Sequence, residues 1–420
     1  MTTPISRRIF LGAAATAAIA ASTRTGKAAA SDRIRVAAFG CKNRGGQVAA
    51  DMQKSGQFDV VALCDCDESM FAEARKELAE TDAKPALLND FRKALDDSTV
   101  DAVIVAVPDH WHALMTCMAL DAGKHVYCEK PMSYNIGDGQ AICMAQDKHP
   151  DRVVHVGTQH RSGKHFQECR DFIRNGGLGK IAFCRAWMCQ SRSALPPMEP
   201  SEPPTGFNYD LWVGPAPFRP YVENMTHYNW HWVIDFGTGE MGNWGVHWLD
   251  TARWILGVDL PDAVTSAAGQ YVTRDAKQWP DTQTVMYEFP NLTMLWEQRL
   301  WTNVGVHGRK TGVEFSGEKG IVILERSGWE FIPREGEPVK HPGSDLMLGH
   351  VTNFAEAIRG QAKSIVPARE GHLSAALCHL GNIAAMTMNR LDVGDESNLL
   401  PNNPSAQTWL KRENREGWQS

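Results

Sequence analysis

Short apolar segments alternate with helix-compatible segments over the first part of the chain, and this alternation constrains the fold more than any other feature. The apolar segments are 34–39, 60–63, 102–107, 125–128 and 153–156, and the helical ones are 46–54, 70–79, 111–122 and 137–148. Strands and helices that alternate at this spacing form βαβ units, whose strands lie parallel. The sequence therefore predicts an α/β fold that begins with a doubly wound parallel sheet over residues 31–158.

The pattern changes after residue 179, where longer strands follow one another with few helices between them. Strands are expected at 181–189, 264–271, 283–289, 293–299, 312–316 and 321–324, with late helices at 351–359 and 371–389. Runs of strands without intervening helices are typical of antiparallel sheets. We expect a C-terminal α/β domain with an open, mostly antiparallel sheet over residues 159–390, followed by a polar tail over 391–420.

The first 30 residues carry the pattern of an export signal. Arg7 and Arg8 precede an apolar stretch at residues 11–21, and the alanines at 28–30 provide a small-residue cleavage site. Because the apolar stretch is too short to span a bilayer, we expect residues 1–30 to be a twin-arginine signal peptide that sends the folded chain to the periplasm. A chain that folds before export is expected to keep its ten cysteines mostly as free thiols.

The charge of the chain argues against several classes of partner. Its formal net charge is −6, and residues 1–30 hold four bases and no acids, so the remainder carries −10. An acidic chain has no overall attraction for phosphate backbones or anionic lipids, so binding to nucleic acid or to a membrane surface is not expected. A small molecule is the expected partner.

A glycine-containing loop follows the first predicted strand and indicates a nucleotide site. The Rossmann fingerprint G-x-G-x-x-G places glycines at three positions, where this chain has Gly40, Lys42 and Gly45. Asn43 and Arg44 complete the loop, which we expect to face the phosphates of a dinucleotide. The lysine in place of the middle glycine either moves the loop outward or replaces a backbone contact with its amine.

Polar side chains also follow the next strands at their carboxyl ends, where open α/β sheets bind ligands. Asp65 is expected to bond the ribose 2′-hydroxyl, and a carboxylate there repels a 2′-phosphate, so NAD is favoured over NADP as the cofactor. The other residues expected at the cofactor are Pro108, Asp109, His112, Glu129 and Lys130. Lys130 is also a candidate for proton transfer, because burial lowers the pKa of a lysine amine.

Four residues recur at a spacing that places them on one face of a helix over 243–256: Asn243, His247, Asp250 and Trp254. We expect His247 to take the proton of a substrate hydroxyl as hydride leaves the same carbon. Asn243 either joins this catalytic group by orienting His247 or only caps the helix. Asp250 either supports the charge of the histidine or pairs with a base.

Aromatic and polar residues indicate a pocket for a sugar-sized ligand. Nine of the 14 tryptophans fall between residues 212 and 301, and flat rings with an N–H group suit the faces of sugars. The residues expected at the substrate are Gln159, Arg161, Trp230, His231 and His247. Arg161 fits a structural ion pair equally well. No metal site is expected, because the histidines at 227 and 231 lie in a segment that resembles a loop.

Several of these motifs together resemble the Gfo/Idh/MocA oxidoreductase family, which includes glucose–fructose oxidoreductases and inositol dehydrogenases, and in particular its exported members. The motifs are Asp65, Pro108–His112, Glu129-Lys130-Pro131, Gly157-Thr158-Gln159 and Gly245–Asp250, and the similarity extends over residues 33–390. The resemblance implies a Rossmann domain and a C-terminal domain whose open sheet forms the floor of the active site. It also implies a homo-oligomer (a dimer or tetramer), a sugar or cyclitol substrate, and a cis bond before Pro131.

One position departs from the family pattern, which usually has aspartate where this chain has Asn243. An amide does not stabilise a cationic His247 as a carboxylate would. We therefore expect Asp250 or Lys130 to compensate.

Three functions remain open at this point. The first is an NAD(P)-dependent oxidoreductase that transfers hydride between a tightly held nicotinamide and a sugar or cyclitol hydroxyl, with the cofactor regenerated in each cycle because a periplasmic enzyme has no NAD pool. The second is redox-neutral glycoside cleavage by oxidation, elimination and reduction. The third is a non-catalytic protein that binds sugar and NAD.

Overall fold

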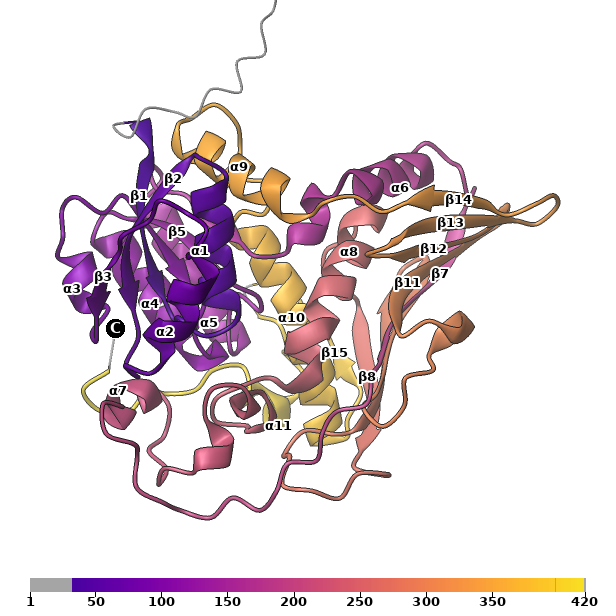
Figure 1. Cartoon of the computed structure of the whole chain (residues 1–420). Helices are drawn as coiled ribbons and strands as arrows, with labels where there is room; N and C mark the ends of the chain where they lie inside the picture. The colour runs from indigo at the N-terminus through magenta and orange to yellow at the C-terminus, as the bar shows by residue number, and fades with distance from the viewer. Residues whose placement is uncertain (1–31, 397, 419–420) are drawn as a thin grey trace, which may run out of the picture.

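The computed structural model describes residues 32–396 and 398–418, and this part of the chain forms two domains (Figure 1). The N-terminal domain is built on a parallel sheet and the C-terminal domain on a larger mixed sheet. Helices α8 (Val246–Leu256) and α10 (Ala368–Thr387) lie between the two sheets. The signal expected at residues 1–30 lies outside the described residues.

The N-terminal sheet has six strands in the described residues, in the order β3-β2-β1-β4-β5-β6, and neighbouring strands run parallel. This is the doubly wound order that the sequence predicts, with its switch point between β1 and β4. Its elements are β1 (Ile34–Phe39), α1 (Arg44–Lys54), β2 (Phe58–Cys64), α2 (Met70–Glu77), β3 (Ala86–Leu88), α3 (Arg92–Leu95), β4 (Ala102–Val105), α4 (His112–Asp121), β5 (His125–Cys128), α5 (Ile136–Lys148) and β6 (Val154–Val156).

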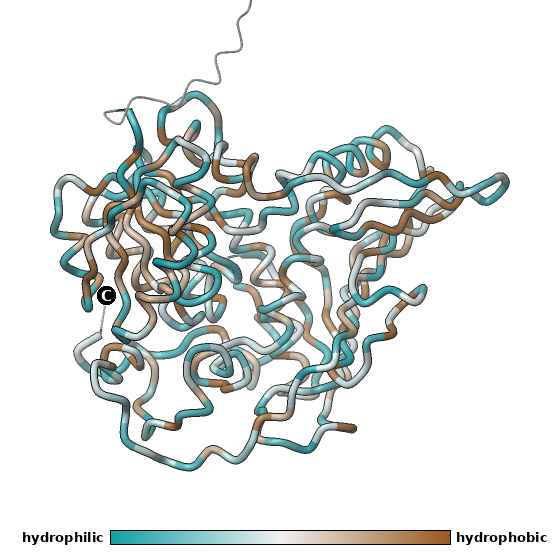
Figure 2. The backbone as a smooth tube through the Cα atoms, viewed as in Figure 1, coloured by the Kyte–Doolittle hydropathy of each residue, from teal (hydrophilic) through white to brown (hydrophobic). Residues whose placement is uncertain are grey.

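The side chains of β1 are divided between two hydrophobic cores. Val36 and Ala38 pack with residues of α1 and α2, whereas Ala37 and Phe39 pack on the opposite face with residues of α4. Because both faces are buried, the strand is a continuous apolar run in the sequence. Figure 2 shows hydrophobic residues along these central strands and hydrophilic residues on the surrounding loops.

The C-terminal sheet has nine strands in the part of the chain that the structure describes, in the order β14-β13-β12-β11-β7-β10-β9-β8-β15. β7 and β10 run parallel, and the other neighbours run antiparallel, as expected for a mostly antiparallel sheet. The strands are β7 (Ile181–Cys189), β8 (Ala263–Gly269), β9 (Thr282–Phe289), β10 (Leu292–Arg299), β11 (Thr311–Gly317), β12 (Gly320–Glu325), β13 (Gly328–Pro333), β14 (Val339–Pro342) and β15 (Leu391–Asp392).

Helices α6 (Lys164–Arg174), α8 and α10 contribute to the hydrophobic core of this sheet. The shorter helices α7 (Tyr209–Val213) and α11 (Pro404–Gln407) lie in connecting segments. The sequence predicts neither α6 nor the hairpin of β13 and β14. Helix α6 buries only a narrow stripe of residues, and the hairpin lies at the edge of the sheet, where alternation is weak.

Helix α9 (Met347–Ile358) returns from the C-terminal sheet to the N-terminal domain (Figure 1). Phe354 is fully buried there, and its ring stacks on Phe58 of β2 at a centroid distance of 5.7 Å. Tyr127 of β5 meets the same ring edge-on. The N-terminal core is therefore completed by a helix that lies almost 200 residues beyond its last strand in the sequence.

The C-terminal tail runs back across the molecule and ends beside the N-terminal domain (Figure 1). Arg412 Nη1 donates to the carbonyl of Asp235 at 2.7 Å, and Arg415 Nε donates to the carbonyl of Gly214 at 2.9 Å. Trp418 packs edge-on against Trp111. The polar tail thus contacts both the N-terminal domain and the long segment before α8.

All ten cysteines lie within the described residues and are free thiols, as predicted. None of the helices in residues 32–396 and 398–418 has both the length and the apolar character that crossing a membrane requires.

We predict that Phe354→Ala destabilises the protein by about 3–5 kcal/mol, because it removes a buried ring and leaves a cavity between α9 and the parallel sheet. Leu348→Ala on the same helix is the control, since Leu348 is 59% exposed, and its effect should stay within about 0.5 kcal/mol. Denaturant unfolding measures both. Equal effects would show that α9 does not support the N-terminal core.

Candidate active site

A cavity of about 390 Å³ lies between the carboxyl ends of the parallel strands and the C-terminal domain. The N-terminal domain contributes the residues that follow β1, β2, β4 and β5. The C-terminal domain contributes side chains from the segment before α8, from α8 itself and from the turn between β12 and β13. The predicted site residues that line it are Gly40, Lys42, Asn43, Arg44, Asp65, Pro108, Asp109, His112, Glu129, Lys130, Gln159, Trp230, His231, Asn243 and His247.

The glycine loop has the close packing that a dinucleotide site requires. Gly40 has a φ of +85°, and a Cβ there would lie 2.3 Å from the carbonyl oxygen of Ala106. A Cβ on Gly45 would lie 1.9 Å from the carbonyl oxygen of Gly40. Both glycines are therefore required by the backbone, and the amino end of α1 is open to a phosphate. The loop fits the diphosphate of NAD.

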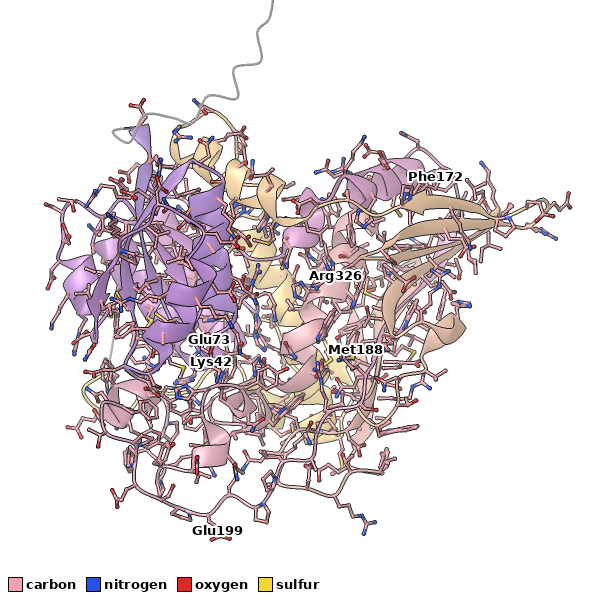
Figure 3. The ribbon with its side chains drawn as sticks, in the orientation of Figure 1. Lys42, Glu73, Phe172, Met188, Glu199 and Arg326 are labelled. Atoms are coloured by element: carbon pink, nitrogen blue, oxygen red, sulfur yellow. The ribbon has the colours of Figure 1, made fainter. Side chains whose placement is uncertain are left out.

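Three of the four residues between these glycines differ in what they offer to a ligand. Asn43 has a φ of 47°, and its backbone N–H donates to Glu73 at 3.0 Å. Arg44 Nε donates to Glu129 Oε1 at 2.7 Å, which joins the loop to the end of β5. Lys42 lines the cavity, and Figure 3 shows it beside Glu73 at the lower edge of the N-terminal domain. Its amine stands where the fingerprint has a glycine.

Asp65 follows β2 and lies partly buried at the cavity wall. Its carboxylate accepts the backbone N–H groups of Cys41 at 2.8 Å and Asp67 at 3.0 Å. Burial nevertheless raises the pKa of Asp65 to about 6. The carboxylate is thus fixed beside the glycine loop, in the position that the ribose contact requires.

Asp109 and His112 hold the site together by contacts within the protein. Asp109 Oδ2 accepts the backbone N–H and hydroxyl of Thr238 at 3.1 and 2.6 Å. The ring nitrogens of His112 lie 2.6 Å from the carbonyl of Pro131 and 2.8 Å from that of Val107. The bond between Lys130 and Pro131 is cis, as the resemblance implied.

Lys130 reaches across the cavity to the C-terminal domain. Its Nζ donates to the carbonyl oxygen of Asn243 at 2.8 Å and to the side-chain Oδ1 of Asn243 at 3.3 Å. Burial lowers the pKa of Lys130, whereas the nearby carboxylates of Glu129 and Asp109 raise it. Because both partners are neutral, the charge of the ammonium is not cancelled by them.

Asn243 does not occupy the role expected from helical spacing. It lies in a π-helical segment (Met241–Gly245) directly before α8. A π-helical turn is wider than an α-helical one, so the regular spacing that predicted a shared face with His247 does not apply. Its side chain bonds to Lys130 rather than to His247. The expectation that Asn243 orients the histidine is therefore wrong, and Asn243 positions the lysine instead.

His247 lies in α8 at the cavity wall and is 5% exposed. Its Nδ1 is buried and has no hydrogen-bond partner among the described residues. Burial, together with Arg326 and Lys130, lowers the pKa of His247 well below 6.5. The imidazole is therefore neutral at neutral pH, and its ring lines the cavity that a ligand would enter.

A hydrogen-bond chain behind His247 includes Arg326 and Thr251, which the sequence did not single out. Arg326 Nε donates to His160 Nε2 at 2.9 Å, so the proton of His160 lies on Nδ1, which is 3.0 Å from the hydroxyl of Thr251. Thr251 in turn donates to the carbonyl of His247 at 2.8 Å. The ring of His160 stacks on that of His247 at 5.0 Å. Because Arg326 lies 79 residues after His247, no spacing rule connects them.

The other predicted substrate residues divide into two groups. Gln159 lines the cavity, and its buried Oε1 has no partner among the described residues. Trp230 and His231 line the opposite wall with their rings stacked at 3.6 Å. The substrate contact expected of Arg161 is wrong, because its buried guanidinium does not line the cavity. Arg161 forms the ion pair that was the alternative. No cluster of metal-ligand side chains occurs within the described residues.

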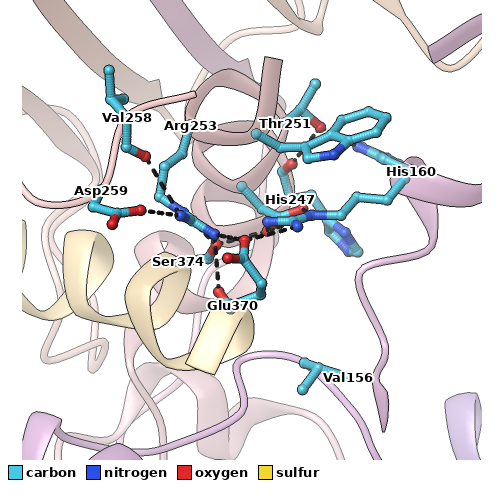
Figure 4. Close-up of polar contacts among 12 residues, drawn as sticks. Val156, His160, His247, Thr251, Arg253, Val258, Asp259, Glu370 and Ser374 are labelled. Carbon is cyan, nitrogen blue, oxygen red and sulfur yellow. Dashed lines mark hydrogen bonds and ion pairs between the residues drawn. The ribbon is translucent and has the colours of Figure 1, made fainter. Parts of the chain in front are cut away.

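The ion pair of Arg161 anchors α8 about one turn beyond His247, and Figure 4 shows the neighbouring contacts among Arg253, Glu370 and Ser374. Arg161 donates through Nε and Nη2 to Asp250, and through Nη1 to Glu370 at 2.9 Å. Glu370 also binds Arg253, and Ser374 donates to Asp250 at 2.6 Å. Asp250 is therefore structural, as one of the two alternatives held, and it does not compensate for Asn243.

We predict that Arg161→Met lowers the free energy of unfolding by about 3–5 kcal/mol, because it leaves Asp250 buried without its cation. Adding Asp250→Leu should recover most of the loss, since both charges are then removed. Lys164→Gln, at an exposed pair with Glu168, should cost less than about 1 kcal/mol. Denaturant unfolding is the measurement. A single variant as stable as the control would refute the anchoring role.

Comparison with known proteins connects this site to a family. Residues 34–158 match the NAD-binding Rossmann-fold domain of the Gfo/Idh/MocA oxidoreductase family, and residues 183–294 match the C-terminal alpha/beta domain of the same family. Inositol 2-dehydrogenase of Salmonella typhimurium is 31% identical over 122 residues, which are 29% of this chain and 35% of that protein. D-glucoside 3-dehydrogenase of Escherichia coli is 32% identical over 156 residues, or 36% and 42% of the two chains.

The fold has solved counterparts. The structure of levoglucosan dehydrogenase in complex with NADH and levoglucosan superposes with a TM-score of 0.67 at 17% identity, covering 86% of this chain and all of that one. At this identity the likeness shows the fold alone. The two family domains match in chain order, and together they cover more than half of the sequence. The chain therefore belongs to the Gfo/Idh/MocA oxidoreductase family.

Proposed function

We propose that the protein is an oxidoreductase that transfers hydride between a tightly held NAD and a hydroxyl-bearing carbon of a sugar or cyclitol. The observation that carries the proposal is that Lys130 and His247 share one cavity with the glycine loop and Asp65. The relatives named for inositol and D-glucoside support the class of substrate. The carboxylate of Asp65 supports NAD over NADP, because it repels a 2′-phosphate.

His247 is suited to handle the proton of the substrate hydroxyl. When bound, NAD supplies a nicotinamide ring that accepts hydride from carbon and returns it. Oxidation of an alcohol also releases the hydroxyl proton, and the neutral imidazole of His247, which lines the cavity, is the base that takes it. In the reverse direction the same imidazole gives the proton back.

Lys130 stabilises the oxygen from which that proton leaves. An ammonium has three N–H donors, and two of those on Lys130 bond to Asn243. The third is available to the substrate oxygen, whose negative charge grows as the proton departs. Asn243 thus directs the amine without neutralising it.

We also propose that the chain is exported with its cofactor bound. The support is the twin-arginine pattern of residues 6–11, together with a loop whose glycines leave no room for side chains. A cofactor that stays bound must be restored within each cycle. This favours paired oxidation and reduction of two sugars over net dehydrogenation.

Denaturing the purified protein should release a stoichiometric amount of NAD into the supernatant, measured by an enzymatic NAD assay. Asp65→Ala should be purified with little NAD, because the ribose contact is lost. Asp147→Ala, an exposed carboxylate on α5, is the matched control and should retain it. Release of NADP, or retention of NAD by Asp65→Ala, would contradict the assignment of Asp65.

His247→Ala should lower turnover about 10²–10⁴-fold, as expected for loss of a general base, while the NAD content stays unchanged. Because the pKa of His247 lies well below 6.5, its neutral form persists as the pH falls. The acidic limb of the rate profile should lie below pH 6.5 and vanish in the variant. His149→Gln, at a surface pair with Asp121, is the control. Unchanged turnover in His247→Ala would exclude the histidine from the mechanism.

A further inference from the structure

Arg326 occupies the turn between β12 and β13, where the C-terminal sheet meets the cavity. Figure 3 shows it on the side of that domain that faces the N-terminal domain. The guanidinium lies over the ring of Trp244 at 4.6 Å and donates through Nε to His160 at 2.9 Å. The ring and the histidine together fix its position at the cavity wall.

The two terminal nitrogens of Arg326 have no hydrogen-bond partner among the described residues. Both nitrogens keep accessible surface, and Arg326 lines the cavity, so they are accessible from it. No carboxylate of the described chain lies within 4.0 Å of the guanidinium, whereas Arg44 in the same cavity binds Glu129. Arg326 is thus a positioned guanidinium without an anion.

Neither ring partner supplies a negative charge. His160 accepts from Arg326 as a neutral imidazole, because Nδ1 carries its proton. Burial and the neighbouring Arg44 lower the pKa of Arg326 to about 10, while the more distant Glu129 acts in the opposite direction. A half-buried cation without a directly bonded counter-ion is costly, and an anion that enters the cavity would offset this cost.

We propose that the substrate is a sugar acid whose carboxylate pairs with the two terminal nitrogens of Arg326. The parallel N–H groups of a guanidinium match the two oxygens of a carboxylate. Arg326 lies beside the proton-handling end of the cavity, because its partner His160 stacks on His247. The inference rests on the proposed oxidation of a sugar hydroxyl, and it adds that the oxidised ring carries an acid group.

The contacts of Arg326, rather than its distance from the glycine loop, favour a substrate role over binding of the cofactor diphosphate. The diphosphate end of the cavity is the glycine loop, where Lys42 provides an amine and α1 begins. Arg326 belongs to the other domain and stacks on Trp244, a flat ring of the kind that packs against sugars. It therefore acts in selecting the substrate.

The test measures binding of matched sugars to the purified full chain with its cofactor. The probes are the methyl glycosides of glucuronate, galacturonate and mannuronate, each paired with the neutral sugar of the same configuration, and glucose 6-phosphate as a second anion. Quenching of tryptophan fluorescence reports binding, and calorimetry confirms it. The variants are Arg326→Gln, Arg326→Lys and, as the control, Arg334→Gln, which removes an exposed arginine one strand away.

We expect at least one acid to bind about tenfold or more tightly than its neutral partner, equivalent to one charge-assisted pair. Arg326→Gln should remove this preference by lowering affinity for the acid much more than affinity for the neutral sugar. Arg326→Lys should retain part of the preference, and Arg334→Gln should retain all of it. Thermal unfolding of each variant checks that it is folded.

The proposal is overturned if no acid binds better than its neutral partner, or if the preference survives in Arg326→Gln. It is also overturned if glucose 6-phosphate binds more tightly than the acids, or if Arg326→Gln loses NAD without losing the preference.

The near-ultraviolet absorbance of reduced nicotinamide separates the two proposals. If acids and neutral sugars reduce the nicotinamide equally, the oxidoreductase proposal stands and the sugar-acid proposal fails. If binding prefers acids through Arg326 but the absorbance does not change, the sugar-acid site stands and the oxidoreductase proposal fails.

Discussion

The buried ion pair between Arg161 and Asp250 is the interaction on which the rest of the site depends. Arg161 follows the last strand of the parallel sheet, and Asp250 lies in the helix that carries His247. Because a charge buried without its partner is strongly unfavourable, the two elements are held in one relative position. The shared carboxylate of Glu370 extends the same constraint to α10. This cluster fixes His247 at the cavity wall, as the proposed proton transfer requires.

Much of the fold could be predicted from the sequence, because burial on both faces makes parallel strands continuous apolar runs. β1 and β7 were predicted with the observed bounds, and Gly40, Asp65 and Lys130 were placed at one edge of the sheet by topology alone. The prediction was weaker where local pattern carries no information on packing. The π-helical segment interrupts a regular 3.6-residue pattern without any sequence signature, so the contact of Asn243 was predicted wrongly. Arg326 lies in the turn of the local β12–β13 hairpin, and this hairpin belongs to the sheet through β11, which pairs with the distant β7. Periodicity does not report that pairing.

The cavity combines carboxylates that are already bonded within the protein with cations whose direct hydrogen-bond partners are neutral. Asp65 and Glu129 lie at the strand ends of the N-terminal domain, and each is already bonded within the protein. Lys130 and Arg326 have neutral partners, so their charges act on whatever occupies the space between them. An amide at position 243 is part of this arrangement, since a carboxylate there would cancel the charge of Lys130. The departure from the family pattern therefore changes the field within the cavity rather than the position of its groups.

The C-terminal tail gives this arrangement a kinetic property. Arg415 and Arg412 bond to the carbonyls of Gly214 and Asp235, which bracket the segment that contributes Trp230 and His231 to the cavity wall. Trp418 then fastens the end of the tail to Trp111 of the N-terminal domain. A movement that opens the cavity on this side must first break these contacts. The residence time of a molecule enclosed there is accordingly governed by residues that never touch it.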